Sequence, residues 1–518
     1  QEELQRRIVQ RERELGMRPI LPAFAGHVPE ALKKVYPNAK ISTTSSWGGF
    51  RDCYKSHFLD PKDSLFNIIQ EKFLKEQTKL YGTDHIYGVD PFNEIDPPSW
   101  EPSFLDDAGK TIYNSLAKND NKTIWVQMTW LFYIDQSHWT KPRIQAFLNS
   151  VPKGKLLLLD YFAENTEVWK ITDSYFGHPF IWCYLGNFGG NTMLAGNFKE
   201  TGQRIGTTMN THNSFDGIGS TLEGFDCNPI MYEYVFDKAW SHVQADNAWI
   251  DSWADRRLGY PNKANREAWH LLVDSVYTHS AALGQAPLIN ARPSFKGHGN
   301  WTTNPTFYYD NKVLANILGK MLEATTGSSE QIRNSQVFDL VNIARQYLSN
   351  HFMFLRDDFS RAYEKKDLNE AKKIATEMTD LLNDLDSLLS LHLYFSFNYW
   401  INNSETFAAN QEEKKYYKRS ACTLLTSWGE VPQSLNDYAS RTWCGLVSGY
   451  YYPRWKMFLD KAIGSLETNS SFDQDSYYKE VTDFERNVSN GDIHYKTYHQ
   501  KREALDLIES IYNKYNNY

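Results

Sequence analysis

The sequence predicts an α/β fold followed by an all-helical domain, and two observations lead to this prediction. In the first half of the chain, apolar segments of strand length alternate with helical stretches, which is typical of a parallel sheet covered on both faces. From about Gln244 onward, apolar residues recur only at helical spacing. We therefore place a sheet or barrel domain at residues 1–244 and a helical domain at residues 245–518. A chain of 518 residues exceeds one hydrophobic core, which agrees with two domains.

Six apolar segments in the first half have the length and the flanking residues of buried strands. They are residues 19–24, 85–92, 124–129, 156–162, 179–186 and 215–222. Helical stretches at residues 65–82 and 102–119 lie between strands, and a charged helix covers residues 1–17. The pattern favours either a (β/α) barrel or an open doubly wound sheet. Six strands are too few to complete a barrel of eight.

In the second half, apolar residues recur at spacings of three and four, which places them on one face of a helix. One such stripe comprises Ile374, Met378, Leu381, Leu385 and Leu388. Another comprises Val337, Val341, Ala344, Leu348 and Leu355. Each stripe predicts the core-facing side of a long helix in a bundle. Residues 251–265 contain Gly and Pro and predict the linker into this domain.

Charge and composition argue against several classes of function. The formal net charge of −8 at pH 7 is the opposite of what a nucleic-acid surface needs. No segment approaches the ~18 apolar residues of a membrane helix. The 5 cysteines and 14 histidines show no metal-ligand spacing, so we predict no metal and no cofactor. Aromatic residues make up 15% of the chain, a surplus that a carbohydrate enzyme would use for stacking on sugars.

Glu94 and Glu223 are the candidate catalytic residues. Each follows a strand-like apolar segment and stands in a loop of turn-forming residues. Such positions lie at the carboxyl edge of a parallel sheet, where these folds place their chemistry. Two facing carboxyl groups are the minimum equipment for cleaving a glycosidic bond. Asp160 also ends a strand and is the best rival, although an ion pair or a loop cap is the favoured role for it.

The segments around these residues resemble one known family. They are HIYGVDPFNEIDPPSW around Glu94, FDGIGSTLEGFDCNP around Glu223, LPAFAGH (21–27), PFIWCYLGNFGGN (179–191) and YYPRW (451–455). From about Gly16 to the C-terminus, the chain resembles the α-N-acetylglucosaminidases of glycoside hydrolase family 89. This resemblance implies a (β/α)8-type barrel and an all-helical domain that contributes to the active-site pocket.

The resemblance implies an exo-acting, retaining hydrolase that removes terminal, non-reducing α-linked N-acetylglucosamine from glycans by double displacement. Glu94 would be the acid/base and Glu223 the nucleophile. The family pattern carries over further substrate contacts to Asn93, His27, Trp130, Tyr161, Cys183, Trp428 and Tyr438. Trp47 is interpreted as a loop anchor, and the glycines of residues 186–191 as a tight turn.

Compared with the family pattern, the chain lacks a small N-terminal β-rich domain and the first two barrel strands. We therefore expect an incomplete barrel of about six strands, open between residues 19–24 and 215–222, and little activity from this chain expressed alone. A naturally shorter, open barrel is the alternative. The resemblance implies a secreted, periplasmic or lysosomal location and a glycan partner. It leaves open whether the protein forms a homo-oligomer. A catalytically silent sugar-binding relative and a helical interaction scaffold are the alternative functions.

Overall fold

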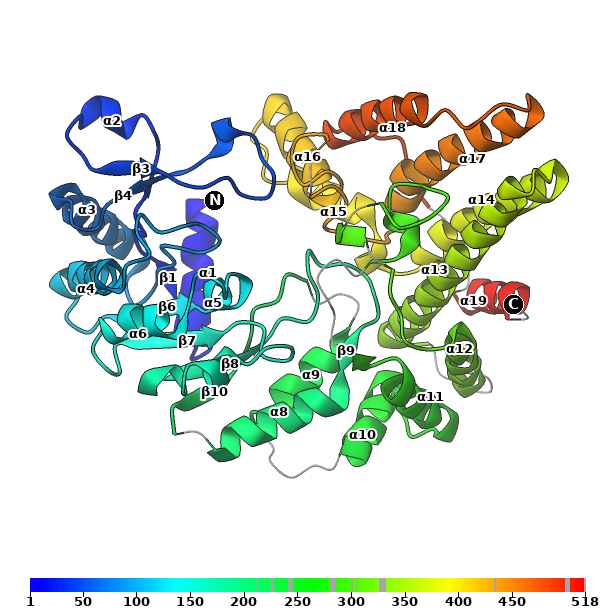
Figure 1. Ribbon diagram of the computed structural model, residues 1–518. Helices are drawn as coiled ribbons and strands as arrows, with labels where there is room; N and C mark the ends of the chain where they lie inside the picture. Colours follow the sequence, from blue (N-terminus) through cyan, green and yellow to red (C-terminus); the bar gives the residue numbers. More distant parts are fainter. Residues whose placement is uncertain are drawn as a thin grey trace. The chain divides into compact units, whose positions relative to one another are not determined.

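Figure 1 shows the computed structural model, in which the chain folds into helices and short strands. The structure describes residues 1–211, 213–224, 228–240, 246–279, 286–299, 301–303, 305–325, 332–432, 435–498 and 504–516. The chain divides into two compact units. Unit 1 comprises Gln1–Leu185 and Thr201–Thr221, and unit 2 comprises Gly186–Glu200 and Leu222–Tyr518.

Unit 1 contains a parallel sheet of six strands in the order β1-β5-β6-β7-β8-β10. The strands are β1 (Leu21–Pro22), β5 (Ile86–Gly88), β6 (Ile124–Met128), β7 (Leu156–Asp160), β8 (Phe180–Tyr184) and β10 (Phe215–Ser220). All six lie within the predicted strand segments, so the prediction of six parallel strands is confirmed. In the part of the chain that the structure describes, β1 and β10 are the two edge strands of this sheet.

The helices predicted between the strands are present and have clear local causes. Helix α3 (Ser64–Tyr81) begins where the Asp63 side chain accepts a hydrogen bond from the Leu65 amide at 2.9 Å. Helix α4 (Pro102–Asn119) has proline in its first turn, where the missing N–H costs nothing. The other helices of the first half are α1 (Glu2–Glu14), α2 (Leu32–Val35), α5 (Trp130–Ile134), α6 (Lys141–Asn149), α7 (Val168–Ile171) and α8 (Phe198–Thr211).

A small antiparallel sheet between β1 and β5 was not predicted. Its order is β2-β4-β3, formed by β2 (His27–Val28), β4 (His57–Leu59) and β3 (Ile41–Thr43). Strands of two or three residues are too short to show an alternating apolar pattern, which explains why the sequence did not reveal them. The loop between β3 and β4 carries Trp47.

Unit 2 is built from helices and a two-stranded antiparallel ribbon of β9 (Gly196–Asn197) and β11 (Thr278–His279). The helices are α9 (Pro229–Asp237), α10 (Asp246–Leu258), α11 (Lys263–Ser275), α12 (Asn311–Thr325), α13 (Asn334–Glu364), α14 (Leu368–Leu389), α15 (Phe397–Glu405), α16 (Gln411–Leu425), α17 (Tyr452–Glu467), α18 (Gln474–Ser489) and α19 (Ala504–Tyr515). Both predicted apolar stripes are buried, one on α13 and the other on α14.

The prediction of a linker at residues 251–265 is wrong. Most of that segment belongs to α10 and α11, and only residues 259–262 separate the two helices. Gly259 has a φ of +104°, and the Asn262 side chain caps α11 by accepting from the Asn265 amide at 3.0 Å. The glycine and the asparagine therefore form a tight helix-to-helix connection. The predicted domain boundary at 244 and 245 lies in a segment outside the described residues.

Among the described helices, none has the length and apolar character needed to cross a lipid bilayer. The four cysteines that the structure describes carry free thiols, of which Cys53 is exposed and the other three are buried. The fifth cysteine, Cys227, lies outside the described residues.

Candidate active site

Glu94 lies in the turn after β5, and two indole N–H groups hold the two oxygens of its carboxyl group. Trp130 donates from Nε1 to Oε1 at 2.5 Å, and Trp47 donates from Nε1 to Oε2. The backbone of Glu94 has a φ of +53°, in the left-handed region that non-glycine residues rarely adopt. Such a conformation persists where surrounding contacts hold it, and the two indoles supply contacts of this kind.

Trp130 and Tyr161 follow the next two strands of the sheet. Trp130 begins α5, two residues after β6, and Tyr161 comes directly after β7. Their rings lie 5.6 Å apart, and the Tyr161 amide donates to the Thr129 hydroxyl at 3.2 Å. The structure therefore brings two of the predicted substrate contacts together beside Glu94.

The other predicted contacts of unit 1 are less directly linked to Glu94. Asn93 precedes it, and the buried side-chain oxygen of Asn93 has no hydrogen-bond partner among the described residues. His27 lies on β2, and its imidazole ring contacts the ring of Phe58 with centroids 5.6 Å apart. Cys183 lies on β8 and is only 1% exposed. Contact of these three side chains with a substrate stays a prediction.

Asp90 is a second carboxyl group close to Glu94 in the same turn. One oxygen, Oδ1, accepts a hydrogen bond from Gln127 Nε2 at 2.6 Å, and the buried Oδ2 has no partner among the described residues. Burial raises the pKa of Asp90 to about 7; the hydrogen bond from Gln127 opposes this shift and the charge of Glu94 adds to it. Asp90 therefore stays neutral under acidic conditions in which an exposed aspartate is ionised.

Asp160, the predicted rival, has a structural role. It is fully buried, and its Oδ1 accepts hydrogen bonds from the Val168 amide at 3.1 Å and from the Tyr175 hydroxyl at 2.8 Å. Burial raises its pKa to about 7. These contacts fix the loop before α7, in agreement with the favoured interpretation of Asp160 as a loop cap. Asp226, another acid near a strand end, lies outside the described residues.

Glu223 belongs to unit 2 and has its own set of donors. Its Oε2 accepts hydrogen bonds from the Gly189 amide at 2.6 Å and from the Tyr438 hydroxyl at 2.9 Å. Glu223 itself is exposed and Tyr438 is half-buried, so these two donors orient a carboxyl group that a ligand can reach. The predicted substrate contact Tyr438 is thus placed beside the predicted nucleophile.

The glycines beside Glu223 permit a close approach of backbone segments. Gly189 has a φ of +62°, and a Cβ there would lie 2.3 Å from the carbonyl oxygen of Tyr438. A Cβ on Gly190 or Gly224 would collide with the guanidinium group of Arg441. The interpretation of residues 186–191 as a tight turn is therefore correct, and the turn also delivers an amide to Glu223.

Trp428 lies next to Tyr438. Their ring centroids are 4.9 Å apart at an interplanar angle of 66°, an edge-to-face arrangement. Both residues belong to unit 2, and both were predicted to line the sugar pocket. The structure places them as one aromatic pair on the side of unit 2 that carries Glu223.

Sequence reasoning missed three residues of the candidate site. Trp47 was interpreted as a loop anchor, yet it donates to Glu94 from a position 47 residues earlier in the chain. Nothing in the sequence separates Asp90 from the other acids near strand ends, and the backbone amide of Gly189 leaves no signature in a sequence. A tryptophan in a glycine-containing loop, SSWGGF, was the one available signal, but it did not indicate a partner.

Two family models together match nearly the whole chain. The model described as alpha-N-acetylglucosaminidase tim-barrel domain matches residues 1–242, and the model of the C-terminal domain of the same family matches residues 249–514. A human protein named alpha-N-acetylglucosaminidase is 33% identical over 521 residues, which is 99% of this chain and 69% of the human protein. The chain belongs to the alpha-N-acetylglucosaminidase family. The resemblance inferred from the sequence is thereby confirmed.

Solved structures of a family 89 glycoside hydrolase from Clostridium perfringens share this fold. The complex with PUGNAc has a TM-score of 0.87 at 24% identity and covers 98% of this chain and 58% of that protein. The complex described as holding its substrate GlcNAc-alpha-1,4-galactose has a TM-score of 0.88 at 24% identity and covers 98% and 57%. The chain thus spans less than two thirds of the length of these bacterial relatives.

We expect the substitution Gly189→Ala to destabilise the protein. The new Cβ would meet the main chain of Tyr438, and alanine is strained at a φ of +62°, so the free energy of unfolding should fall by about 2 kcal/mol or more. Gly206→Ala, in α8, is the matched control, because no atom lies within 4 Å of its new Cβ. That control should gain about 0.5–1 kcal/mol from helix propensity. Denaturant unfolding of both variants tests this, and equal stabilities would contradict it.

The raised pKa of Asp90 predicts a pH-dependent stability. Between the ordinary pKa of 3.8 and about 7, the folded protein binds a proton at Asp90 that the unfolded chain has released. Stability from this group is therefore highest below pH 4 and is lost as the pH rises toward 7. Asp90→Asn cannot ionise, so its unfolding free energy should decline less over this interval than that of the wild type. Urea unfolding at several pH values measures the difference, with the exposed Asp380→Asn as control. Parallel curves for Asp90→Asn and wild type would refute the assignment.

Proposed function

We propose that this protein is an exo-acting glycoside hydrolase that removes terminal, non-reducing α-linked N-acetylglucosamine from glycans. Its membership of the alpha-N-acetylglucosaminidase family supports this activity. The observation that carries the proposal is the pair of glutamates, each in a loop after a parallel strand and each with its own hydrogen-bond donors. A carboxyl pair is what hydrolysis of a glycosidic bond requires.

The proposed reaction is a double displacement. Glu94, protonated, gives its proton to the glycosidic oxygen while the Glu223 carboxylate attacks the anomeric carbon and the bond to the leaving group breaks. The product is a covalent ester of the sugar on Glu223 and a free leaving-group alcohol. In the second step, Glu94 takes a proton from water, whose oxygen attacks the same carbon and releases the sugar and Glu223. The configuration at the anomeric carbon is inverted twice and so retained.

The contacts around each glutamate suit these roles. The indole N–H groups of Trp47 and Trp130 donate to both carboxyl oxygens of Glu94, which limits the orientations of this side chain. On Glu223 the donors from Gly189 and Tyr438 share Oε2, so Oε1 is the oxygen that we assign to the attack on the sugar. The proposed reaction therefore uses one defined oxygen of the nucleophile.

The remaining assigned residues would recognise the sugar. We assign Asn93 to a substrate hydroxyl or N–H group, because its buried oxygen has no partner among the described residues and a buried acceptor gains most from one. The rings of Trp130, Tyr161, Trp428 and Tyr438 offer aromatic faces for stacking. His27 and Cys183 complete the set by family resemblance.

Substitution of each glutamate tests the activity. With an aryl α-N-acetylglucosaminide, Glu223→Gln should lower kcat on the order of 10⁴-fold, because the nucleophile is lost. Glu94→Gln should lower it about 10²–10⁴-fold for a sugar leaving group and less for a nitrophenyl group, which departs without protonation. Glu71→Gln, on the exposed surface of α3, is the matched control and should retain full activity. An inactive wild type that still binds the sugar would instead support a silent binding relative.

The stereochemistry of the product tests the double displacement separately. Proton NMR during hydrolysis should detect the α-anomer of N-acetylglucosamine first, followed by slow mutarotation to the mixture. A slowly hydrolysed fluorosugar should label Glu223, and mass spectrometry of peptides locates the label. Initial formation of the β-anomer would show an inverting reaction and rule out a covalent intermediate.

A further inference from the structure

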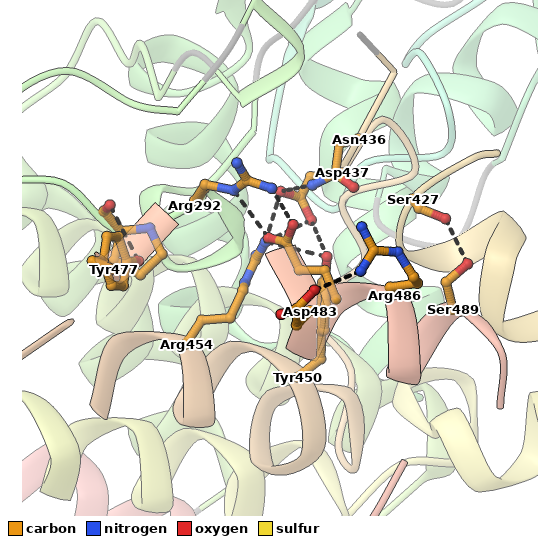
Figure 2. A network of polar contacts seen from close by, with 12 residues as sticks. Arg292, Ser427, Asn436, Asp437, Tyr450, Arg454, Tyr477, Asp483, Arg486 and Ser489 are labelled. Atoms are coloured by element: carbon orange, nitrogen blue, oxygen red, sulfur yellow. Dashed lines mark hydrogen bonds and ion pairs between the residues drawn. The ribbon is translucent and has the colours of Figure 1, made fainter. Parts of the chain in front are cut away.

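A buried cluster of charged side chains lies beneath the segment that carries Tyr438. Figure 2 shows its central members, Arg454 on α17, Asp437, Arg292 and Tyr450, all of which belong to unit 2. Arg454 is 0% exposed and Asp437 is 2% exposed. Glu485 on α18 is also 0% exposed and completes the cluster. Charges this deeply buried are tolerated only where their partners are fixed in position.

Asp437 is the member that belongs to the Tyr438 segment itself. Its carboxylate accepts hydrogen bonds from Arg454 Nη1 at 2.9 Å and 3.1 Å and from the Tyr450 hydroxyl at 3.0 Å. Its backbone amide donates to the Thr426 carbonyl at 2.7 Å, and its φ is +66°. A non-glycine residue in this left-handed conformation needs strong contacts to hold it, and the carboxylate provides them.

Arg454 also reaches the other side of Tyr438. Its Nη2 donates to the backbone carbonyl of Asn290 at 2.7 Å. The side-chain amide of Asn290 then donates to the carbonyl and to the hydroxyl of Ser440, each at 3.0 Å. The residues on both sides of Tyr438 are therefore tied to one buried guanidinium group, directly through Asp437 and indirectly through Asn290.

The position of this segment affects Glu223 at two points. The Tyr438 hydroxyl donates to Glu223 Oε2 at 2.9 Å. The Tyr438 carbonyl packs so tightly on Gly189 that no Cβ fits there, and the Gly189 amide is the second donor to the same oxygen. A shift of the segment would therefore disturb both donors of Glu223 together.

We propose that Asp437 and Arg454 are positioning residues that set the Tyr438 hydroxyl against Glu223. This inference rests on the proposed role of Glu223 as the nucleophile. The ion pair itself does not touch the sugar. It fixes the backbone of residues 437–440 through directional bonds, whereas apolar packing would define a position less sharply. A misplacement of about 1 Å at a reacting group can cost up to 10²-fold in rate.

A double-mutant cycle tests whether Asp437 acts through Tyr438. Asp437→Asn preserves the side-chain shape and leaves Arg454 paired with Glu485 at 2.9 Å, so the protein should still fold. We expect Asp437→Asn to lower kcat about 10–100-fold on an aryl α-N-acetylglucosaminide, with a smaller change in KM. In the Tyr438→Phe background the hydroxyl is already lost and only the Gly189 amide is left to disturb, so Asp437→Asn should lower kcat clearly less than in the wild type, by about threefold. An equal loss in both backgrounds would overturn the proposal.

The matched control is Asp339→Asn. Asp339 is a buried carboxylate of α13 in the same unit, bonded to Arg257 of α10 at 2.7 Å and 2.8 Å. It loses a comparable ion pair and should lose comparable thermal stability. Asp339 is bonded to Arg257 of α10 and not to the segment of residues 437–440. The kcat of Asp339→Asn should therefore match that of the wild type. A fall in kcat as large as that of Asp437→Asn would mean that general destabilisation explains both.

Hydrogen–deuterium exchange of the peptide covering residues 435–442 gives a readout that does not depend on catalysis. This peptide should exchange at least about tenfold faster in Asp437→Asn and at the wild-type rate in Asp339→Asn. Unchanged exchange in Asp437→Asn overturns the positioning role whatever the kinetics. Faster exchange in Asp437→Asn, together with a wild type that does not cleave α-linked N-acetylglucosamine, supports the positioning role and refutes the proposed function.

Discussion

The parallel pairing of six strands is the constraint on which the chemistry of unit 1 depends. Parallel strands all end at the same edge of a sheet, so the residues that follow neighbouring strands become neighbours in space. Glu94, Trp130 and Tyr161 follow β5, β6 and β7, which pair in that order. They lie 67 residues apart at most along the chain, and the pairing alone brings them together. The aromatic rings then support the carboxyl group of Glu94 in its left-handed turn.

In unit 2 a buried cluster of charged side chains, rather than strand pairing, holds the residues beside Glu223 in position. The helices present an apolar core, illustrated by the stripes on α13 and α14, but apolar contacts are not directional. The segment around Tyr438 has no regular secondary structure. Its geometry comes from hydrogen bonds to the buried Arg454 and Asn290. Buried charges are costly unless they are paired, and hydrogen bonds are directional, so such a cluster has one defined geometry once it has formed.

The acids near the strand ends show how environment assigns different roles to one functional group. Asp160 accepts two hydrogen bonds through Oδ1, from the Val168 amide and the Tyr175 hydroxyl, and serves the loop before α7. Asp90 is half-buried and accepts one hydrogen bond, from Gln127, close to the charge of Glu94. Each of these two aspartates keeps one oxygen without a partner among the described residues, and burial raises the pKa of each to about 7. Glu94 and Glu223 are more exposed, and each is oriented by two donors. All four lie at or shortly after the end of a strand, so position alone does not distinguish a structural acid from a reactive one.

The sequence by itself determined the six strands, the helices α3 and α4, the buried stripes of α13 and α14, and the family. These features depend on local periodicity or on long characteristic segments, both of which can be read along the chain. The short strands β2, β3 and β4 were not predicted, because two or three residues are too few to show an alternating pattern. The Gly and Pro of residues 251–265 suggested a linker, whereas the chain there only turns between two helices. The contacts that define the candidate site were decided by tertiary structure. Trp47 is hydrogen-bonded to Glu94, 47 residues away in the sequence, and Tyr438 to Glu223, 215 residues away. A backbone amide or a buried guanidinium group forms its hydrogen bonds only when the whole unit has folded.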